Sequence, residues 1–329
     1  ISQEEKQAAL DESIWVLAQE AEKQLYSWYI DEALRESAEL LGLSADEVIQ
    51  GGFKIYTAYD ARLQTIADEV YADSSFFPAA ASDGTPIQSA MAVVDTNNGA
   101  VLAMIGGRDY TVRRGLNRAT QMRRQPGSAL KPLAVYGPAL ELGYTTASVL
   151  LDEKTSFGGY TPRNAGDRYY GLVTMRTAIR NSLNTTAVRL LEEIGLDASI
   201  QYLNKMGIPT RNSDRNLSLA LGSMTYGVTP VELAAAYVPY ANGGIYHQPY
   251  CVERIETVDG SNVYERKDSG KQVLSAQNAF LMTSLLQSVV SSGTGTRMLA
   301  ANTPIAGKTG TVSMTGGNRD IWMTAYTPE

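Results

Sequence analysis

The chain is organised around the stretch Arg124-Gln125-Pro126-Gly127-Ser128-Ala129-Leu130-Lys131-Pro132, which sets a hydroxyl and an amine three residues apart. Pro126-Gly127 is typical of a turn, and a run without glycine begins at Ser128. We therefore expect Ser128 in the first turn of a helix, close to free N–H groups and the positive end of the dipole. Lys131 would then lie on the same helix face.

Ser128 and Lys131 are candidates for a nucleophile and its base. A serine hydroxyl becomes a good nucleophile only when a base takes its proton. A lysine can do so when it is desolvated or crowded by another cation. A single S-x-x-K pattern is expected about once by chance in a chain of this length. The pair therefore needs a second cation from elsewhere in the sequence.

The composition predicts one large domain with an appendage. The chain has 329 residues, of which 44% are hydrophobic, and no run approaches the roughly 18 apolar residues that would span a bilayer. Cys251 is the single cysteine and His247 the single histidine, so neither an internal disulfide nor a zinc cluster is expected. We expect no metal and no cofactor, and we expect His247, between a turn and a strand start, to be structural.

The charge is distributed unevenly along the chain. Residues 1–50 carry twelve acidic and three basic residues, whereas the whole chain has a net charge of -7. Arginines dominate the stretch before Ser128, at positions 108, 113, 114, 118, 123 and 124. No interleaved aromatic motif accompanies them, so nucleic acid is not an expected partner. The alternatives are a solvated face or a field that favours an anionic substrate.

Periodicity and turn signals predict an α+β protein in which helices outnumber strands after residue 128. Helices are expected at 3–41, 44–50, 60–71, 128–142, 174–182, 184–194, 197–206, 229–241 and 275–291. Strands are expected at 53–59, 88–95, 100–105, 250–257, 263–266, 308–312 and 321–326. We expect the 275–291 helix to bury Phe280, Leu281, Leu285 and Val289. The Asn98-Gly99 pair predicts a hairpin between 88–95 and 100–105, and 250–266 and 308–326 are also expected to form hairpins.

Three short patterns follow one another in the chain, and each occurs once. They are Ser128-Ala129-Leu130-Lys131, Ser182-Leu183-Asn184 and Lys308-Thr309-Gly310-Thr311. Together and in this order they resemble the motifs of serine β-lactamases and penicillin-binding proteins. The surrounding sequence, including Gly307 and the stretch 227–234, is similar to the transpeptidase domain of bimodular, class A penicillin-binding proteins. The resemblance covers about residues 51–329.

The resemblance implies roles for the serines, the lysine and the asparagine of the first two patterns, and for Lys308 of the third. Lys308 would be the second cation that lowers the pKa of Lys131 and lets it accept the Ser128 proton. Ser182 would relay a proton to the leaving amine, and Asn184 would hold the amide of the donor peptide. The alternative for Ser182 and Asn184, taken alone, is helix capping.

The third pattern, which includes Lys308, is expected to bind substrate. The hydroxyls of Thr309 and Thr311 would receive a substrate carboxylate, and Gly310 would let a peptide lie against the strand. The backbone N–H groups of Ser128 and Thr311 would form the oxyanion hole. Without the other two patterns, the two threonines would be read as ordinary strand residues.

The expected fold is the penicillin-binding protein and serine β-lactamase-like fold, an antiparallel sheet flanked by helices with a mainly helical subdomain. Its domains would be an acidic helical segment at 1–50, a linker strand and helix at 51–86, and the transpeptidase domain at 87–329. The last sheet strand and C-terminal helix of the family are not found before Glu329, so we expect that remainder elsewhere in the full protein.

The resemblance implies a peptidoglycan D,D-transpeptidase that cross-links stem peptides ending in D-Ala-D-Ala and is acylated by β-lactam antibiotics. A class A β-lactamase uses a deacylating glutamate after the Ser-x-Asn element. Here no glutamate lies between Glu193 and Glu232, so efficient β-lactam hydrolysis is not expected. The alternatives are a D,D-carboxypeptidase and a non-catalytic β-lactam sensor or scaffold.

The resemblance also implies neighbours in the full protein. These are an upstream glycosyltransferase domain and a membrane anchor that would hold this domain at the outer face of the bacterial cytoplasmic membrane.

Overall fold

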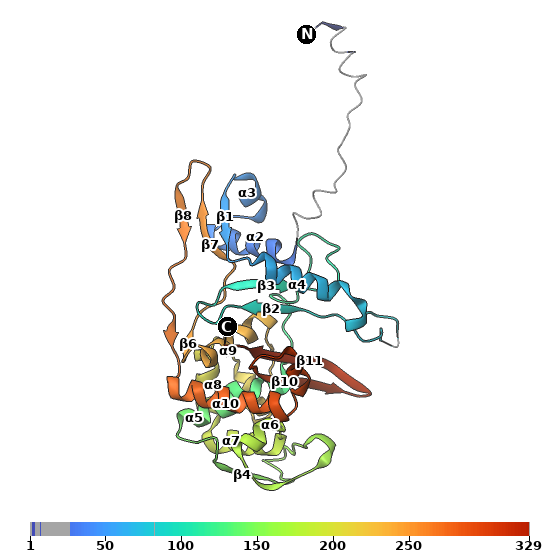
Figure 1. The fold of residues 1–329 in the computed structure, drawn as a ribbon, viewed down its shortest axis with the longest axis vertical. Helices are drawn as coiled ribbons and strands as arrows, with labels where there is room; N and C mark the ends of the chain where they lie inside the picture. Colours follow the sequence, from blue (N-terminus) through green and yellow to red (C-terminus); the bar gives the residue numbers. More distant parts are fainter. Residues whose placement is uncertain (1, 4–6, 8–26, 82, 329) are drawn as a thin grey trace.

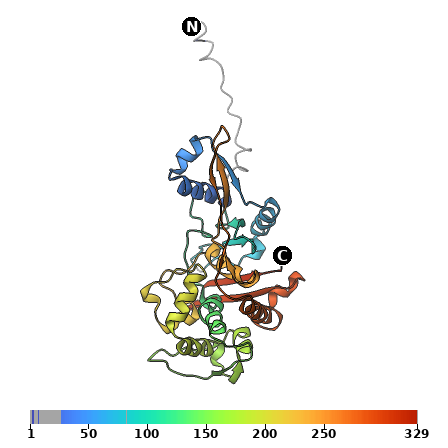
Figure 2. The same ribbon diagram turned by 90° about the vertical axis from the view of Figure 1, so that its left-hand side faces the viewer.

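The computed structural model describes residues 2, 3, 7, 27–81 and 83–328. These residues form an elongated molecule, with a small module at one end and a larger helical body at the other (Figures 1 and 2). The small module consists of residues 27–60 and 250–266. In the described part, no helix is long and apolar enough to cross a membrane.

Local capping signals define the helices of the small module. Helix α2 (Trp28–Leu41) begins at the N-cap Ser27 and ends at Gly42. Helix α3 (Ala45–Gln50) begins with the predicted capping box between Ser44 and Glu47. The 28–41 part of the predicted 3–41 helix is confirmed, and residues 4–6 and 8–26 lie outside the described residues.

The small module is completed by strands from two distant parts of the chain. Strand β1 (Lys54–Thr57) pairs antiparallel with β7 (Val252–Glu256), which also pairs with β8 (Asn262–Glu265). The predicted 250–266 hairpin is confirmed, whereas its pairing with β1 was not predicted. Figure 2 shows this hairpin beside α2 and α3.

Between the module and the body lie a helix and a hairpin. Helix α4 (Ala61–Ala72) starts at Asp60, whose carboxylate accepts from two backbone N–H groups. Strands β2 (Met91–Val94) and β3 (Val101–Ile105) pair antiparallel, as predicted. Side chains of α2, α4, β3 and β7 share one buried apolar cluster, which joins the small module to the hairpin.

The helical body contains most of the buried apolar residues. Its α-helices are α5 (Gly137–Glu141), α6 (Met175–Arg180), α7 (Asn184–Ile194), α8 (Leu196–Lys205), α9 (Pro230–Ala241) and α10 (Ala276–Ser292). Short strand pairs join β4 (Val149–Asp152) to β5 (Gly171–Thr174) and β6 (Ile245–Tyr246) to β9 (Lys271–Gln272). Short 3₁₀ segments lie at Ser74–Phe76, Ala165–Asp167, Asn212–Asp214, Leu217–Leu221 and Thr296–Ala301.

Two predictions for this body need correction. The 128–142 segment is a 3₁₀ turn, η3 (Gly127–Leu130), then a π turn, η4 (Pro132–Tyr136), and then α5. Pro132 and Pro138 each lack the N–H that a continuous α-helix needs. Of the four residues expected to be buried, Leu285 and Val289 are, whereas Leu281 is half-buried and Phe280 is 72% exposed. The buried face of α10 passes through Ala279 and Met282 rather than through Phe280.

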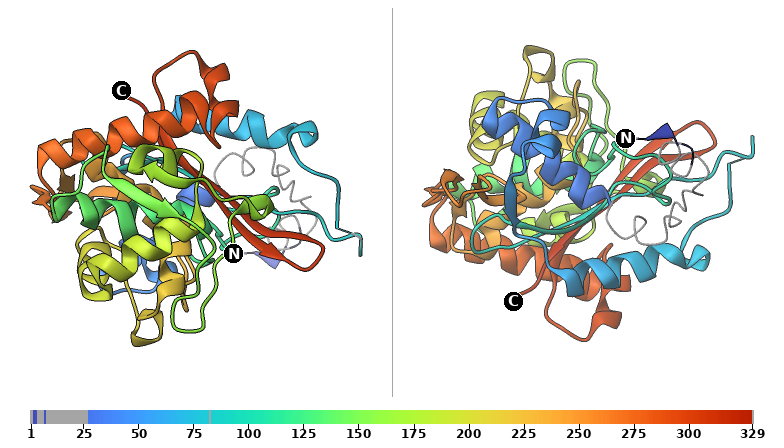
Figure 3. Two further views of the ribbon diagram at one scale, coloured as in Figure 1. Left: turned by 90° about the horizontal axis from the view of Figure 1, so that it is seen from below. Right: turned by 90° about the horizontal axis from the view of Figure 1, so that it is seen from above.

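The last described strands form a long hairpin. Strand β10 (Ala306–Met314) pairs antiparallel with β11 (Gly317–Tyr326), which confirms the predicted 308–326 hairpin and extends it. Helix α10 packs along β10 (Figure 3). Among the described residues, β2–β3 and β10–β11 remain separate two-stranded sheets, so the edges that the sequence left without partners are still unpaired.

Candidate active site

Backbone hydrogen bonds and a glycine fix the turn that carries Ser128. The backbone of Arg124 exchanges two hydrogen bonds with Val228, at 2.9 and 2.8 Å. Gly127 has a φ of +55°, a conformation that favours glycine. Ser128 then lies in the 3₁₀ turn η3, half-buried, and its hydroxyl makes no hydrogen bond with any described residue.

Strand β10 lies directly against this turn. A Cβ at Gly310 would clash with the carbonyl oxygen of Pro126, and a Cβ at Gly127 would clash with the backbone of Thr311. Trp322, which pairs with Gly310 across the hairpin, donates its indole N–H to the Gln125 carbonyl at 3.0 Å. These close approaches bring the backbone of residue 311 beside the turn that holds Ser128.

Lys131 is fully buried, and its ammonium group faces the turn between α6 and α7. Nζ donates to the carbonyls of Ser182 and Leu183 at 2.7 and 3.0 Å and to Asn184 Oδ1 at 2.7 Å. The Lys131 backbone N–H donates to the Ser128 carbonyl, but in the described part no hydrogen bond joins Lys131 Nζ to the Ser128 hydroxyl. The expected base is therefore held by the second motif, one helical turn from the nucleophile.

Ser182 lies between the two lysines. Its hydroxyl accepts from Lys308 Nζ at 2.9 Å and from Lys131 Nζ at 3.4 Å. Its φ is +55°, an unfavourable value for a residue with a side chain. This backbone conformation turns the carbonyl and the hydroxyl of one residue toward the same buried ammonium group.

The electrostatics of the site follow from burial of two like charges. Both lysine side chains are 0% exposed. Burial lowers the pKa of Lys308 to about 7. Burial is also the main reason why the pKa of Lys131 falls well below its ordinary value, and repulsion from Lys308 is the second. The predicted effect of Lys308 is present, but it is not the larger one.

Asn184 uses both ends of its amide within the protein. Oδ1 accepts from Lys131, and Nδ2 donates to the Arg163 carbonyl at 2.6 Å. The predicted threonines differ from each other: Thr309 is half-buried and its hydroxyl lies 2.7 Å from that of Thr294, whereas Thr311 is exposed.

The structure therefore brings all three motifs to one place. Hydrogen bonds join Lys131, Ser182, Asn184 and Lys308, and strand packing against the turn brings in the Gly310-Thr311 backbone. His247 is excluded from the site, since it is buried and its Nδ1 lies 3.3 Å from Asp268.

Sequence reasoning missed a buried polar pair beneath the second motif. Asn164 Oδ1 accepts from the backbone N–H groups of Asn184 and Thr185, at 2.7 and 3.2 Å, and so caps α7 from a distant loop. Its Nδ2 donates to Asp152 at 2.7 Å, and the Thr185 hydroxyl donates to the same carboxylate. No local pattern marks these residues, because the cap comes from outside the helix.

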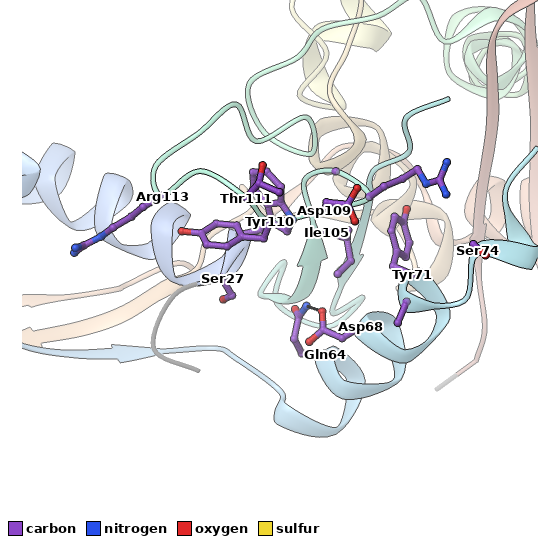
Figure 4. Close-up of a pocket in the computed structure, with 14 residues that line it drawn as sticks. Ser27, Gln64, Asp68, Tyr71, Ser74, Ile105, Asp109, Tyr110, Thr111 and Arg113 are labelled. Atoms are coloured by element: carbon purple, nitrogen blue, oxygen red, sulfur yellow. Dashed lines mark hydrogen bonds between the residues drawn. The ribbon is translucent and has the colours of Figure 1, made fainter. Parts of the chain in front are cut away.

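The structure also has a cavity that lies away from the three motifs. It has a volume of about 900 Å³ and lies between α2, α4 and the end of β3 (Figure 4). Its walls include Gln64, Asp68, Tyr71 and Tyr110, and none of the predicted site residues lines it. Size alone therefore does not mark the active site of this chain.

Comparison with known proteins agrees with this geometry. The family model "Penicillin binding protein transpeptidase domain" matches residues 89–329. The chain belongs to this family. The family match confirms the resemblance drawn from the three motifs.

Relatives of this penicillin-binding domain are found among named bacterial proteins. The chain is 40% identical over 316 residues to penicillin-binding protein 1F of Bacillus subtilis, covering 94% of this chain and 43% of that protein. It is 34% identical to penicillin-binding protein 2a of Streptococcus pneumoniae, covering 92% of this chain and 42% of that protein. The chain thus spans less than half the length of these relatives.

Solved structures share the fold. The penicillin-binding protein PonA1 of Mycobacterium tuberculosis superposes with a TM-score of 0.77 at 25% identity, covering 91% of this chain and 80% of that one. The same protein has been solved in complex with penicillin V. The penicillin-binding, β-lactamase-like fold is therefore confirmed.

Proposed function

We propose that this penicillin-binding domain is a serine D,D-transpeptidase, with Ser128 as nucleophile and Lys131 as base. The observation that carries the proposal is the Ser182 hydroxyl, which lies between two fully buried lysines beside the turn of Ser128. Two buried ammonium groups cannot both stay charged at low cost. Lys131 is the one that gives up its proton, since both burial and Lys308 act on it.

In the first step the neutral Lys131 amine takes the Ser128 proton, and Oγ attacks the carbonyl of the terminal D-Ala-D-Ala bond. Backbone N–H groups of Ser128 and Thr311 receive the developing negative charge. The C–N bond then breaks, and the proton held by Lys131 passes through the Ser182 hydroxyl to the leaving D-alanine amine, which returns Lys131 to its neutral form. Asn184, Lys308, Thr309 and Gly310 bind the peptide, with the hydroxyls of Thr309 and Thr311 directed to its carboxylate.

In the second step an amine of a neighbouring stem peptide attacks the Ser128 ester and forms the cross-link. Hydrolysis is disfavoured because no glutamate lies between Glu193 and Glu232, the region after the Ser-x-Asn element where a class A β-lactamase has its deacylating glutamate. Glu232 closes the capping box of α9 through the Thr229 N–H and is paired with Arg123. A β-lactam is expected to acylate Ser128 and to remain bound.

The wider setting belongs to the proposal as well. The partners are peptidoglycan stem peptides ending in D-Ala-D-Ala, β-lactam antibiotics, and a glycosyltransferase domain with a membrane anchor in the full protein. The domain would act at the outer face of the bacterial cytoplasmic membrane. The length of the relatives supports this, since they are more than twice as long as the matched region.

A fluorescent penicillin tests the nucleophile. It should label the wild-type chain and fail to label Ser128→Ala. Labelling of Lys131→Ala should be at least about 100-fold slower, since a general base is lost. Ser213→Ala, an exposed serine outside the site, is the control. Labelling that survives Ser128→Ala would contradict the proposal.

An acceptor amine separates the alternatives. With a D-Ala-D-Ala peptide and an added amine, a transpeptidase yields the cross-linked product, whereas a D,D-carboxypeptidase yields only the trimmed peptide. Labelling without either product would identify a β-lactam sensor.

A further inference from the structure

A small cavity opens beside Ser182. It has a volume of about 290 Å³ and is bounded by three segments: the loop 164–170, the turn 181–183 and the turn 292–294. The charged side chain in its lining is that of Arg168, and Tyr170, Asn181 and Thr294 add polar groups. No residue assigned above to peptide binding lines this cavity.

The buried pair Asp152 and Asn164 fixes the loop that forms one wall. Asn164 Nδ2 donates to the Arg168 carbonyl at 2.9 Å, and the Tyr170 N–H donates to Asp152 Oδ2 at 3.0 Å. The same asparagine caps α7 at residue 184. The buried pair therefore sets the backbone of residues 168 and 170 relative to the catalytic turn, so the cavity has a preformed wall.

The chemistry of the second step indicates what this cavity holds. In the first step the departing amine receives its proton at Ser182. By microscopic reversibility, the amine that attacks the Ser128 ester loses its proton along the same route. The amide C–N bond forms, the ester C–O bond breaks, and the amine proton returns to Ser128 Oγ. The acceptor must therefore approach from the Ser182 side of the ester.

Charge identifies the class of acceptor. No ion pair to Arg168 is found within the part of the chain that the structure describes, and Arg168 is an exposed residue that lines the cavity. An acceptor stem peptide carries both the reacting amine and free carboxylates. A guanidinium group binds a carboxylate through paired hydrogen bonds.

We propose that the cavity beside Ser182 is the acceptor subsite, and that Arg168 binds a carboxylate of the acceptor peptide while its amine meets the Ser128 ester. The inference rests on the proposed transpeptidase function and adds the site of the second substrate.

The experiment measures how the acyl-enzyme divides between amine transfer and hydrolysis. A donor thioester forms the acyl-enzyme, and a D-amino acid peptide with a free carboxylate is the acceptor. Arg168→Ala should lower the ratio of transfer to hydrolysis about threefold to fivefold, as expected for an exposed ion pair. Arg62→Ala, an exposed arginine on α4, is the matched control.

An amidated acceptor completes the test. The wild type should transfer the amidated acceptor about as poorly as Arg168→Ala transfers the acceptor with a free carboxylate. Arg168→Ala should not lower the transfer of the amidated acceptor any further. An equal loss with both acceptors, or no loss with either, would overturn the assignment of Arg168. A wild-type chain that no penicillin labels would instead overturn the proposed function, so the two failures are distinguishable.

Discussion

Ser182 has an unfavourable backbone conformation and also contacts the two buried lysines of the candidate active site. Its φ of +55° puts a residue with a Cβ in the left-handed region, which costs about 1 kcal/mol. The neighbouring carbonyls and the Ser182 hydroxyl thereby all reach buried lysines. The strain is retained because it directs these oxygens inward.

Two substitutions at Ser182 separate the effect of backbone strain on stability from the effect of the hydroxyl on labelling. Ser182→Gly and Ser182→Ala both lose the hydroxyl, so we expect penicillin labelling to slow about 100-fold in each. Ser182→Gly should nevertheless be more stable than Ser182→Ala by about 1 kcal/mol, because glycine adopts this φ without cost. Urea unfolding checks the difference. Equal stability would mean that the backbone at 182 is not strained.

Lys308 gives a pH dependence whose sign is fixed by burial. Its pKa is about 7 in the folded chain and 10.5 in the ordinary state. Between these values the unfolded chain binds more protons, so the free energy of unfolding increases with pH, by at most about 1.4 kcal/mol per unit. Lys308→Met should reduce the slope by this contribution and leave that of Lys131, whose pKa is also lowered. Urea unfolding at several pH values measures both slopes.

The control for this slope is Lys271→Met, at an exposed lysine on β9, which should keep it. A wild-type stability that falls as the pH rises above 7 would contradict the buried, neutralised lysine.

The lysines also show how far sequence reasoning reached at this scale. The three motifs in order, and the family that they resemble, were enough to expect that Ser128, Lys131, Ser182, Asn184 and Lys308 would meet. It led us to attribute the lowered pKa of Lys131 chiefly to Lys308. Burial has the larger effect, and the degree of burial depends on the whole packed core, which no local pattern encodes.

At the scale of elements, the start of α7 depends on a residue outside the helix. Leu183, at the N-cap position, offers no side-chain acceptor, and Asn164 supplies the oxygen instead. The position of Asn184, and through it one of the hydrogen bonds to Lys131, is therefore set by the loop before β5.

Asn164→Ala should cost about 1–3 kcal/mol of stability, since it removes a cap and leaves the buried Asp152 without one donor. It should also slow the chemical step of penicillin labelling more than it weakens initial binding. Ser275→Ala removes the cap of α10 at a similar cost in stability and should leave labelling intact.

The double variant Asp152→Asn with Asn164→Asp reverses the direction of the buried hydrogen bond and keeps an acceptor at α7. We expect it to recover part of the labelling rate. If Asn164→Ala and Ser275→Ala slow labelling equally, the cap acts only through stability.

Element boundaries illustrate the same division between local and distant causes. The capping box of α3 and the β2–β3 hairpin were predictable because their signals lie within a few residues. The change of helix type along 127–141 and the exposed Phe280 were not predicted. Pro132 and Pro138 were a local signal that the prediction of one α-helix left unused, whereas the packing of α10 against other helices has no local signal.

At the scale of the whole molecule, α2 forms a junction with later segments of the chain, both inside the small module and beyond it. Glu36 accepts from the Cys251 backbone N–H at 2.7 Å, and Asp31 accepts from the Tyr110 hydroxyl at 2.8 Å. Tyr29 donates to the Val101 carbonyl at 2.7 Å. The domain boundaries expected at residues 50 and 86 stay predictions, although these contacts cross both.

Glu36 should make this junction sensitive to pH. Burial is the main cause that raises its pKa above the ordinary 4.5. Its contribution to stability is therefore complete below pH 4.5 and is lost as the pH rises through the folded value. Glu36→Gln keeps an acceptor oxygen, so it should raise the melting temperature at pH 7 and reduce the decline above pH 4.5.

Glu36→Ala is the comparison, since it removes the oxygen as well as the charge. If Glu36→Gln and Glu36→Ala lower the melting temperature at pH 7 by the same amount, the negative charge of Glu36 stabilises the junction, and its burial is not a cost.

The sheet of the small module also constrains the order in which the chain can fold. Tyr56 on β1 and Glu256 beside it on β7 are 200 residues apart. During synthesis β1 leaves the ribosome long before its partner strand exists, and closing so long a loop slows folding. Until residue 256 has emerged, β1 is an unpaired strand edge, so the nascent chain is exposed to aggregation at the end of the molecule farthest from its active site.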